Sequence, residues 1–99
     1  MLPIEIDPRA ERELLQAVKF YATRVAQLGA EFLDAADAAF DQIAGDPLRY
    51  RIVKADIRRH RMKRFRFAVL YRVLPDRIRV LAIAHPSRHP SHWEHRINR

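Results

Sequence analysis

The chain has 99 residues, which is enough for one domain and leaves no room for a second hydrophobic core. Apolar residues make up 48% of it and only 2 residues are glycine, so we expect a folded domain rather than a disordered chain. There is no cysteine, which excludes disulfides, zinc–thiolate sites and thiol catalysis.

The net charge of +7 is distributed unevenly along the chain. Residues 1–46 hold 4 Lys/Arg and 9 Asp/Glu, a net charge of −5, whereas residues 47–99 hold 15 and 3, a net charge of +12. This polarisation predicts that the second half presents a basic surface to a polyanion or to an acidic protein. The alternative interpretation is a surface that is merely well solvated.

The first residues predict a short strand followed at once by a helix. Leu2, Ile4 and Ile6 alternate with polar or proline positions, Asp7 suits a helix N-cap, and Pro8 suits the first helical position. The start lacks the basic and apolar regions of a signal peptide, and no apolar run approaches the roughly 20 residues that span a bilayer. We therefore expect a cytoplasmic protein with no membrane partner.

Two helices are expected next. A stripe of apolar residues at alternating spacings of four and three predicts a first helix of roughly five turns, interrupted at Gly29. A second helix is expected over residues 30–44, with an acidic outer face, and Gly45 and Pro47 mark its end. Together these two segments predict an antiparallel helical hairpin. The stripe of the first helix consists of Leu14, Val18, Tyr21, Val25 and Leu28.

Beyond residue 50 the apolar period changes to that of strands. Residues 57–63, 65–73 and 78–84 predict three antiparallel strands, with a tight turn at 74–77 and the last strand apolar enough to be central. The expected fold class is α+β: a short N-terminal strand and a helical hairpin packed on a small antiparallel sheet, in the order β-α-α-β-β-β, as a single domain over residues 1–99.

The run of basic residues from Arg58 to Arg66 is the strongest functional signal. In a continuous strand, Arg59, Arg61 and Lys63 would share one face, and Arg58, His60 and Arg64 would share the other. Like charges stacked on a sheet repel, so this face needs solvent, counterions or an anionic partner. It either contacts phosphates or acidic groups, or is an edge strand that its charges protect from aggregation. Three aromatic residues follow this run, and we expect most of them to lie in the core: Phe65, Phe67 and Tyr71.

The tail after residue 84 holds four of the five histidines, two prolines and Trp93. A metal site is not expected, because the prolines prevent a continuous helix from aligning His85 with His89 and the segment has no thiolate. A second hypothesis is acid–base chemistry on RNA by His85, with arginine neighbours that stabilise the developing charge. For Trp93 the preferred interpretation is that it folds back onto the sheet, with one short helical turn around it.

The order of these segments resembles the ParE/RelE superfamily of toxins from bacterial type II toxin–antitoxin pairs. The similarity covers nearly the whole chain. It rests on residues 6–14 for the first strand and helix entry, 43–47 for the end of the hairpin, 57–73 for the next two strands, and 77–85 with 88–90 and Trp93 for the last strand and tail.

The resemblance implies two N-terminal helices against an antiparallel sheet, no cofactor, and a cognate ParD-like antitoxin. The antitoxin's C-terminal segment would wrap the toxin, and only the antitoxin would bind operator DNA. The antitoxin-binding residues implied are Val18, Tyr21, Val25, Arg64 and Arg66.

The two branches of the superfamily imply different targets. A ParE-like toxin inhibits DNA gyrase without being a nuclease, and the Arg-Arg strand and the His-x-x-Arg tail resemble this branch more. Its target-binding residues would be Arg58, Arg59, Arg61, Lys63, Arg88 and Trp93. A RelE-like toxin would cut mRNA on the ribosome, with His85, Arg88, Arg59 and Arg61 as catalytic candidates. A basic nucleic-acid-binding module without toxicity is the third possibility.

Overall fold

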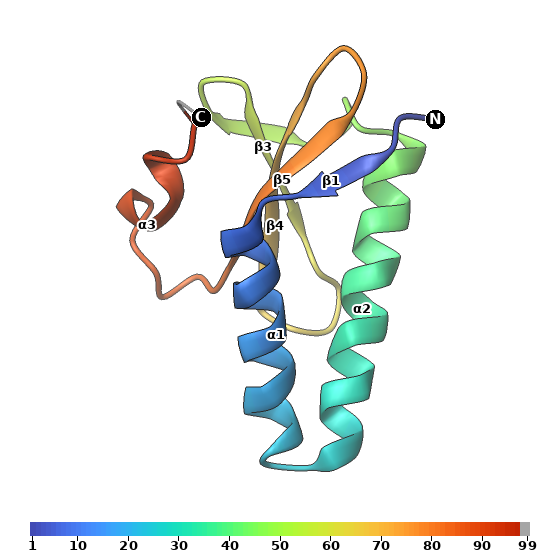
Figure 1. Ribbon diagram of the computed structural model, residues 1–99, viewed down its shortest axis with the longest axis vertical. Coiled ribbons are helices and arrows are strands. Elements are labelled where there is room, and N and C mark those ends of the chain that lie inside the picture. The colour runs from blue at the N-terminus through green and yellow to red at the C-terminus, as the bar shows by residue number, and fades with distance from the viewer. Residues whose placement is uncertain (98–99) are drawn as a thin grey trace.

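Five strands form one sheet, with two long helices on one of its faces, in the computed structural model, which describes residues 1–97 (Figure 1). The strand order is β1-β5-β4-β3-β2. Every neighbouring pair is antiparallel except β1 and β5, which are parallel. The elements in chain order are β1 (Ile4–Ile6), α1 (Pro8–Ala22), α2 (Ala26–Gly45), β2 (Arg51–Lys54), β3 (Ile57–Arg61), β4 (Ala68–Val73), β5 (Ile78–Ala84) and α3 (Ser91–Glu94).

The α+β class, the helical hairpin and the central position of β5 are confirmed, and three details are corrected. The sheet is mixed rather than antiparallel, because β1 lies beside β5 and runs in the same direction. The strand β2 was not predicted, because three of its four residues are exposed and its pattern lacks an apolar face. The strand predicted over 57–63 ends at Arg61, and the next begins at Ala68 rather than at residue 65.

The helical hairpin turns earlier than its apolar stripe predicts. The first helix ends at Ala22, and Val25 is the extended N-cap of α2, with φ −144°. Val25 and Leu28 therefore continue the spacing of α1 without belonging to it. Gly29 lies inside α2, where a Cβ atom would stand only 2.8 Å from the Cβ of Ala22. The two helices approach closely at this point, and only glycine leaves the necessary space.

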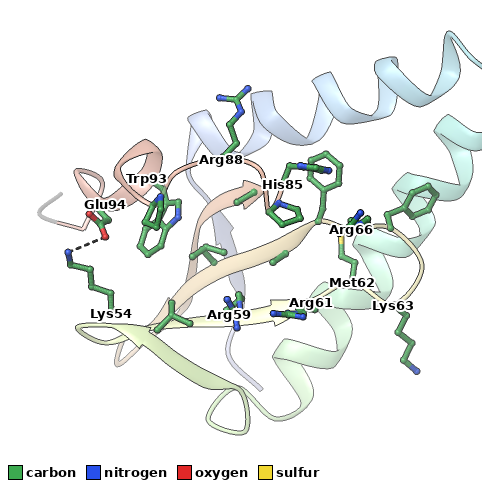
Figure 2. Close-up of a pocket in the computed structure, with 18 of the residues that line it drawn as sticks. Lys54, Arg59, Arg61, Met62, Lys63, Arg66, His85, Arg88, Trp93 and Glu94 are labelled. Carbon is green, nitrogen blue, oxygen red and sulfur yellow. Dashed lines mark ion pairs between the residues drawn. The ribbon is translucent and has the colours of Figure 1, made fainter.

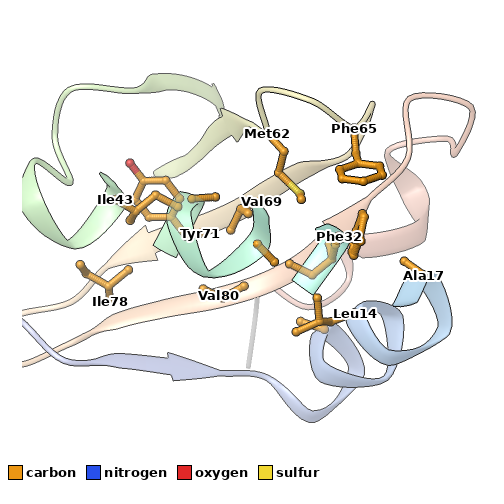
Figure 3. Close-up of a cluster of buried hydrophobic side chains, with 14 residues drawn as sticks. Leu14, Ala17, Phe32, Ile43, Met62, Phe65, Val69, Tyr71, Ile78 and Val80 are labelled. Carbon is orange, nitrogen blue, oxygen red and sulfur yellow. The ribbon is translucent and has the colours of Figure 1, made fainter. Parts of the chain in front are cut away.

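The main core lies between the hairpin and the sheet (Figure 3). Leu14 from α1 and Phe32 and Ile43 from α2 meet side chains of β4 and β5, including the fully buried Tyr71 and Val80. Each such side chain contributes about 1.5–3 kcal/mol through burial alone. The hydroxyl of Tyr71 donates to the carbonyl of Pro47 at 2.5 Å, and burial raises its pKa to about 12.

The loop between β3 and β4, residues 62–67, is held against the hairpin by aromatic contacts. The ring of Phe65 lies 4.8 Å from that of Tyr21, and the ring of Phe67 lies 5.1 Å from that of Phe32. Such edge-to-face pairs add roughly 0.5–1.5 kcal/mol beyond area burial. These two phenylalanines therefore belong to the core, as predicted, although they lie in a loop and not in a strand.

A smaller cluster covers part of the opposite face of the sheet. Trp93, at 6% exposure, packs with Ile57, Leu70, Leu81 and Ala82. The predicted helical turn around Trp93 and its return onto the sheet are both confirmed. Within residues 1–97, no helix is both long enough and apolar enough to cross a bilayer.

Candidate functional site

An open groove of about 740 Å³ lies on the face of the sheet that the helical hairpin leaves free (Figure 2). Strands β3 and β4 and the end of β5 form its floor. The β3–β4 loop forms one wall, and the C-terminal tail that begins at His85 forms the other. We call it the basic groove. Its lining residues are Val53, Lys54, Arg59, Arg61, Met62, Lys63, Arg64, Phe65, Arg66, Phe67, Ala68, Leu70, Ala84, His85, Pro86, Arg88, Pro90, Trp93 and Glu94.

The strand register explains why the groove is hollow at this point. Arg61 lies opposite Ala68, and Ala68 lies opposite Ala84, so the row across the three strands has two methyl groups where larger side chains would fill the space. At the other end of the same face, Trp93 occupies the corresponding space above Ile57. The groove is therefore the part of the free face that the tail does not cover.

The charge of the groove is almost entirely positive. Its single carboxylate, that of Glu94, is paired with Lys54 at 3.1 Å. Among the cations, Arg64 pairs with Glu31 of α2. Within the described part of the chain, neither an ion pair nor a side-chain hydrogen bond neutralises the remaining strand and loop cations, which are Arg59, Arg61, Lys63 and Arg66.

The other face of β3 has a structural role. Arg58 donates to the carbonyls of Leu48 and Tyr50 at 2.9 and 2.7 Å, which stabilises the segment before β2. The buried His60 lies 2.8 Å from Oε1 of Gln42 in α2. Burial, with smaller contributions from nearby cations, lowers the pKa of His60, so the ring is neutral at neutral pH. The predicted separation of Arg59 and Arg61 from Arg58 and His60 is thus correct, and Arg58 lies outside the groove.

The catalytic candidates Arg59, Arg61, His85 and Arg88 all line the groove. The Nδ1 atom of His85 lies 2.8 Å from the hydroxyl of Ser87 and accepts from the Ser87 backbone N–H at 3.2 Å. Because Nδ1 is an acceptor here, the neutral ring carries its proton on Nε2. A general base needs an unprotonated ring nitrogen that can accept a proton from the substrate. In His85 that nitrogen is Nδ1, which already contacts the hydroxyl and the backbone N–H of Ser87.

A buried ion pair fixes the tail that forms the second wall. Arg96, at 6% exposure, donates to both carboxylate oxygens of Glu13 in α1, at 3.0 and 3.1 Å, and to the carbonyl of Leu81 at 2.8 Å. Glu13 also accepts from the backbone N–H of Ile83 at 3.1 Å and lies 2.5 Å from Nε2 of His92. Burial tends to raise the pKa of Glu13, but these hydrogen bonds outweigh it and the pKa lies below its ordinary value.

Sequence reasoning missed this cluster, although it positions the tail. Glu13 precedes the apolar Leu14 in an ordinary helical pattern, and its partners lie 70 to 83 residues further along the chain. No local signal could have identified the pair. The cluster also satisfies backbone groups at the edge of β5. Strand β1 pairs only with residues 78–80 of β5, and beyond them Arg96 donates to the carbonyl of Leu81 and Glu13 accepts from the N–H of Ile83.

The predicted antitoxin-binding residues have different environments. Val18 and Tyr21 are half-buried against the main core, whereas Val25 is 55% exposed and Arg66 is exposed. Three further large apolar residues reach the surface of the hairpin and lie off the predicted stripe, whose members Leu14, Val18 and Tyr21 pack against the main core. They are Leu15, Phe20 and Leu33.

The tail histidines do not converge. No group of three or more potential ligands among the His, Asp and Glu residues of positions 1–97 is arranged to hold a metal ion. His89 and His85 each bond a serine two residues further along, at 3.0 and 2.8 Å, in two separate local turns.

Comparisons with known proteins identify the fold and the family. A search of curated proteins finds no match. A solved structure described as the chromosomal ParDE TA system from P. aeruginosa is similar in fold, with a TM-score of 0.67 and 18% identity over 86% of this chain and 96% of that chain. The sequence profile of the ParE toxin of the type II toxin-antitoxin system parDE matches residues 4–90. This match spans most of the chain, the sheet and hairpin included, and the chain therefore belongs to the ParE toxin family.

Proposed function

We propose that this chain is a cytoplasmic toxin that inhibits DNA gyrase and is neutralised by a cognate ParD-like antitoxin. One observation carries the proposal: a member of the ParE family keeps an open groove in which most cations have no ion pair with an acid of residues 1–97. Since unpaired guanidinium groups on a sheet repel one another, such a surface is maintained at some cost in stability. An anionic partner would remove that cost.

The target-contacting residues proposed are those that face the basic groove without an internal ion pair. Among the groove cations without an ion pair within residues 1–97, they are Arg59 and Arg61 on the floor, Lys63 on the loop, and Arg88 on the tail; the remaining one, Arg66, is assigned to the antitoxin below. Arg58 and Trp93 support this surface from within, because Arg58 is bonded to backbone carbonyls and Trp93 is buried under the tail. Their substitution would change the shape of the groove rather than remove a contact.

The antitoxin is proposed to cover the outer surface of the hairpin and the adjoining loop. Val25 and Phe20 are exposed apolar anchors, and Arg64 and Arg66 lie on the loop that packs through Phe65 on Tyr21, the residue after Phe20. Val18 and Tyr21 support the anchors from beneath. An amphipathic helix is the segment best suited to such a surface. Operator DNA would be reached only through the antitoxin.

Ribosome-dependent mRNA cleavage is the alternative, because all of its catalytic candidates, His85, Arg59, Arg61 and Arg88, line one groove. The hydrogen bonds of Ser87 to Nδ1 weigh against His85 as a general base. We therefore favour inhibition of gyrase over cleavage of RNA.

The deciding experiment compares two purified systems. The wild-type chain is titrated into a gyrase supercoiling reaction and into a cell-free translation reaction. Inhibition of supercoiling with unimpaired translation supports the proposal, whereas the reverse result supports RNA cleavage. The double variant Arg59→Ala/Arg61→Ala is expected to lose at least tenfold in inhibitory potency. The control Arg12→Ala/Lys19→Ala removes the same charge from the exposed face of α1 and should inhibit like the wild type.

A further inference from the structure

We infer that the basic groove of one copy of this chain receives the outer face of α2 from a second copy, so that the protein associates head to tail. This goes beyond the proposed function, because it is a property of the isolated chain and would hold whatever the target is. Three observations support it: the acids on α2, their spacing, and an exposed leucine among them.

The first observation is a stripe of acids on the outer face of α2. Asp34, Asp37 and Asp41 are all exposed, and none of them forms an ion pair with another group of residues 1–97. They lie opposite the buried side of the helix, which includes Phe32 and Ala36. The groove has the opposite charge and most of its cations also lack an internal partner, so the two surfaces are electrostatically complementary.

One contact within the chain shows that these two surfaces can pair. Arg64, on the wall of the groove, forms an ion pair with Glu31, which lies three residues before Asp34 on α2. The acids further along α2 face away from the sheet, whereas the groove lies on the sheet face that the hairpin leaves free (Figure 1). Charges on opposite sides of one molecule cannot meet each other, but they can meet between two molecules.

The second observation is the spacing of the charges. Asp37 and Asp41 are four residues apart on one helix face, which is a rise of about 6 Å. Arg59 and Arg61 are two residues apart on one strand face, which is a rise of roughly 6.6–6.8 Å. Two carboxylates with this repeat can bind two guanidinium groups at once, and charge-assisted pairs of this kind are stronger than hydrogen bonds between neutral groups.

The third observation adds an apolar contact to the charges. Leu33, beside Asp34 on α2, is 40% exposed. The half-buried Phe67 and Val53 line the groove among its cations. A helix that lies in a groove with an apolar side chain at its centre and charged residues at its margin is a common form of protein recognition. The contact therefore fits a folded acidic helix rather than a diffuse cloud of counterions.

The geometry of the two surfaces also predicts the type of assembly. The face of α2 and the groove are different surfaces, so the contact is heterologous and each added copy leaves one groove and one helix face free. Such contacts produce open chains or rings rather than a closed two-fold dimer. Each contact covers one groove, and association would therefore hide its cations from a target.

The test is sedimentation velocity of the purified chain at several protein concentrations. At about 10 mM salt, where the Debye length is about 30 Å, the average mass should rise with concentration, and at about 1 M salt it should fall to that of the monomer. Asp37→Asn/Asp41→Asn and Arg59→Ala/Arg61→Ala should each be monomeric at low salt, because each lacks one of the two surfaces. Their equimolar mixture should form a complex that stops at two chains, because the first variant keeps the groove and the second keeps the acids.

Matched single variants separate a site from general attraction. Asp37→Asn should weaken association about fivefold, whereas Glu11→Gln, which removes one exposed acid from α1, should stay within about twofold of the wild type. Leu33→Ser removes no charge and should weaken association several-fold, because the apolar contact is lost. Far-ultraviolet circular dichroism checks that each variant is folded.

Several results would overturn the inference. A wild-type chain that stays monomeric at low salt would do so, as would a mixture of the two double variants that fails to associate. Equal weakening by Glu11→Gln and Asp37→Asn, or unchanged association in Leu33→Ser, would indicate charge attraction without a site. A dimer that persists in Arg59→Ala/Arg61→Ala would place the contact elsewhere. None of these measurements involves gyrase, so the inference can fail while the proposed function stands.

Discussion

Two groups of arginines on or beside the sheet have opposite environments. At the β1–β5 edge, Arg9 and Arg79 both bond the carboxylate of Asp7 at 2.9 Å, and Arg77 bonds Glu5 at 3.1 Å. In the basic groove, the arginines of β3 have no acid within the described residues. The difference is that Asp7 and Glu5 lie within bonding distance of the first group, whereas no carboxylate of the described residues lies that close to the second. Arginines that the fold neutralises stabilise it, and arginines that it leaves unpaired are available to a partner.

A third arrangement lies between these two groups. Arg96 is buried and paired with Glu13, so its charge is not available to solvent or to a partner molecule. Its Nε atom has no hydrogen-bond partner in the described structure. The guanidinium therefore depends on Glu13 for its compensation. This pair holds the tail against α1 and gives the groove its second wall.

The largest expected effect is that of Glu13→Gln. The substitution leaves the buried guanidinium of Arg96 without a counter-charge, which we expect to lower the free energy of unfolding by about 3 kcal/mol. The tail should loosen, and Trp93, the single tryptophan, should become more exposed. Urea unfolding and the red shift of tryptophan emission measure the two consequences. Glu11→Gln, at an exposed position of the same helix, is the control; an unshifted emission in Glu13→Gln would show that the pair does not hold the tail.

A smaller effect is expected at the neutralised edge. The hydrogen bond from Arg9 holds the pKa of Asp7 well below its ordinary value, so the ionised carboxylate stabilises the fold. That stability is complete above the unfolded pKa of about 3.9 and is lost as the pH falls toward the folded value. Asp7→Asn keeps a capping oxygen and should cost about 1–2 kcal/mol at pH 7. The difference in unfolding free energy between wild type and variant should narrow as the pH falls below about 4; a constant difference in denaturant titrations would contradict the role of the charge.

The smallest effect on stability is expected in the groove. Arg59→Ala/Arg61→Ala should change the free energy of unfolding by no more than about 0.5 kcal/mol, with a slight gain at low salt because a repulsion is removed. Arg79→Ala on β5 of the same sheet, which breaks the ion pairs with Glu5 and Asp7, should cost about 1 kcal/mol. Thermal unfolding at two salt concentrations compares them. Equal losses would mean that the groove arginines have structural partners after all.

Local chemistry determined a large part of this protein. The alternation in residues 2–6, followed by Asp7 and Pro8, predicts β1 and the start of α1, and the capping bond from Arg9 N–H to Asp7 at 2.8 Å confirms it. The apolar periods likewise predict the hairpin, the last two strands and the two faces of β3. These features depend on which side of an element a residue faces, and a period of two or of about 3.6 residues encodes that directly.

Only the tertiary structure decided which charges remain free. Arg59 and Arg79 are both arginines on strands, and nothing nearby in the sequence distinguishes them. Packing brings β1 beside β5, and so Asp7 to Arg79, while no acid among residues 1–97 reaches Arg59. The pair of Glu13 and Arg96 is separated by 83 residues and depends on the same packing. Hydrogen bonds and ion pairs act over about 3 Å, and only the packed fold determines which distant side chains come that close.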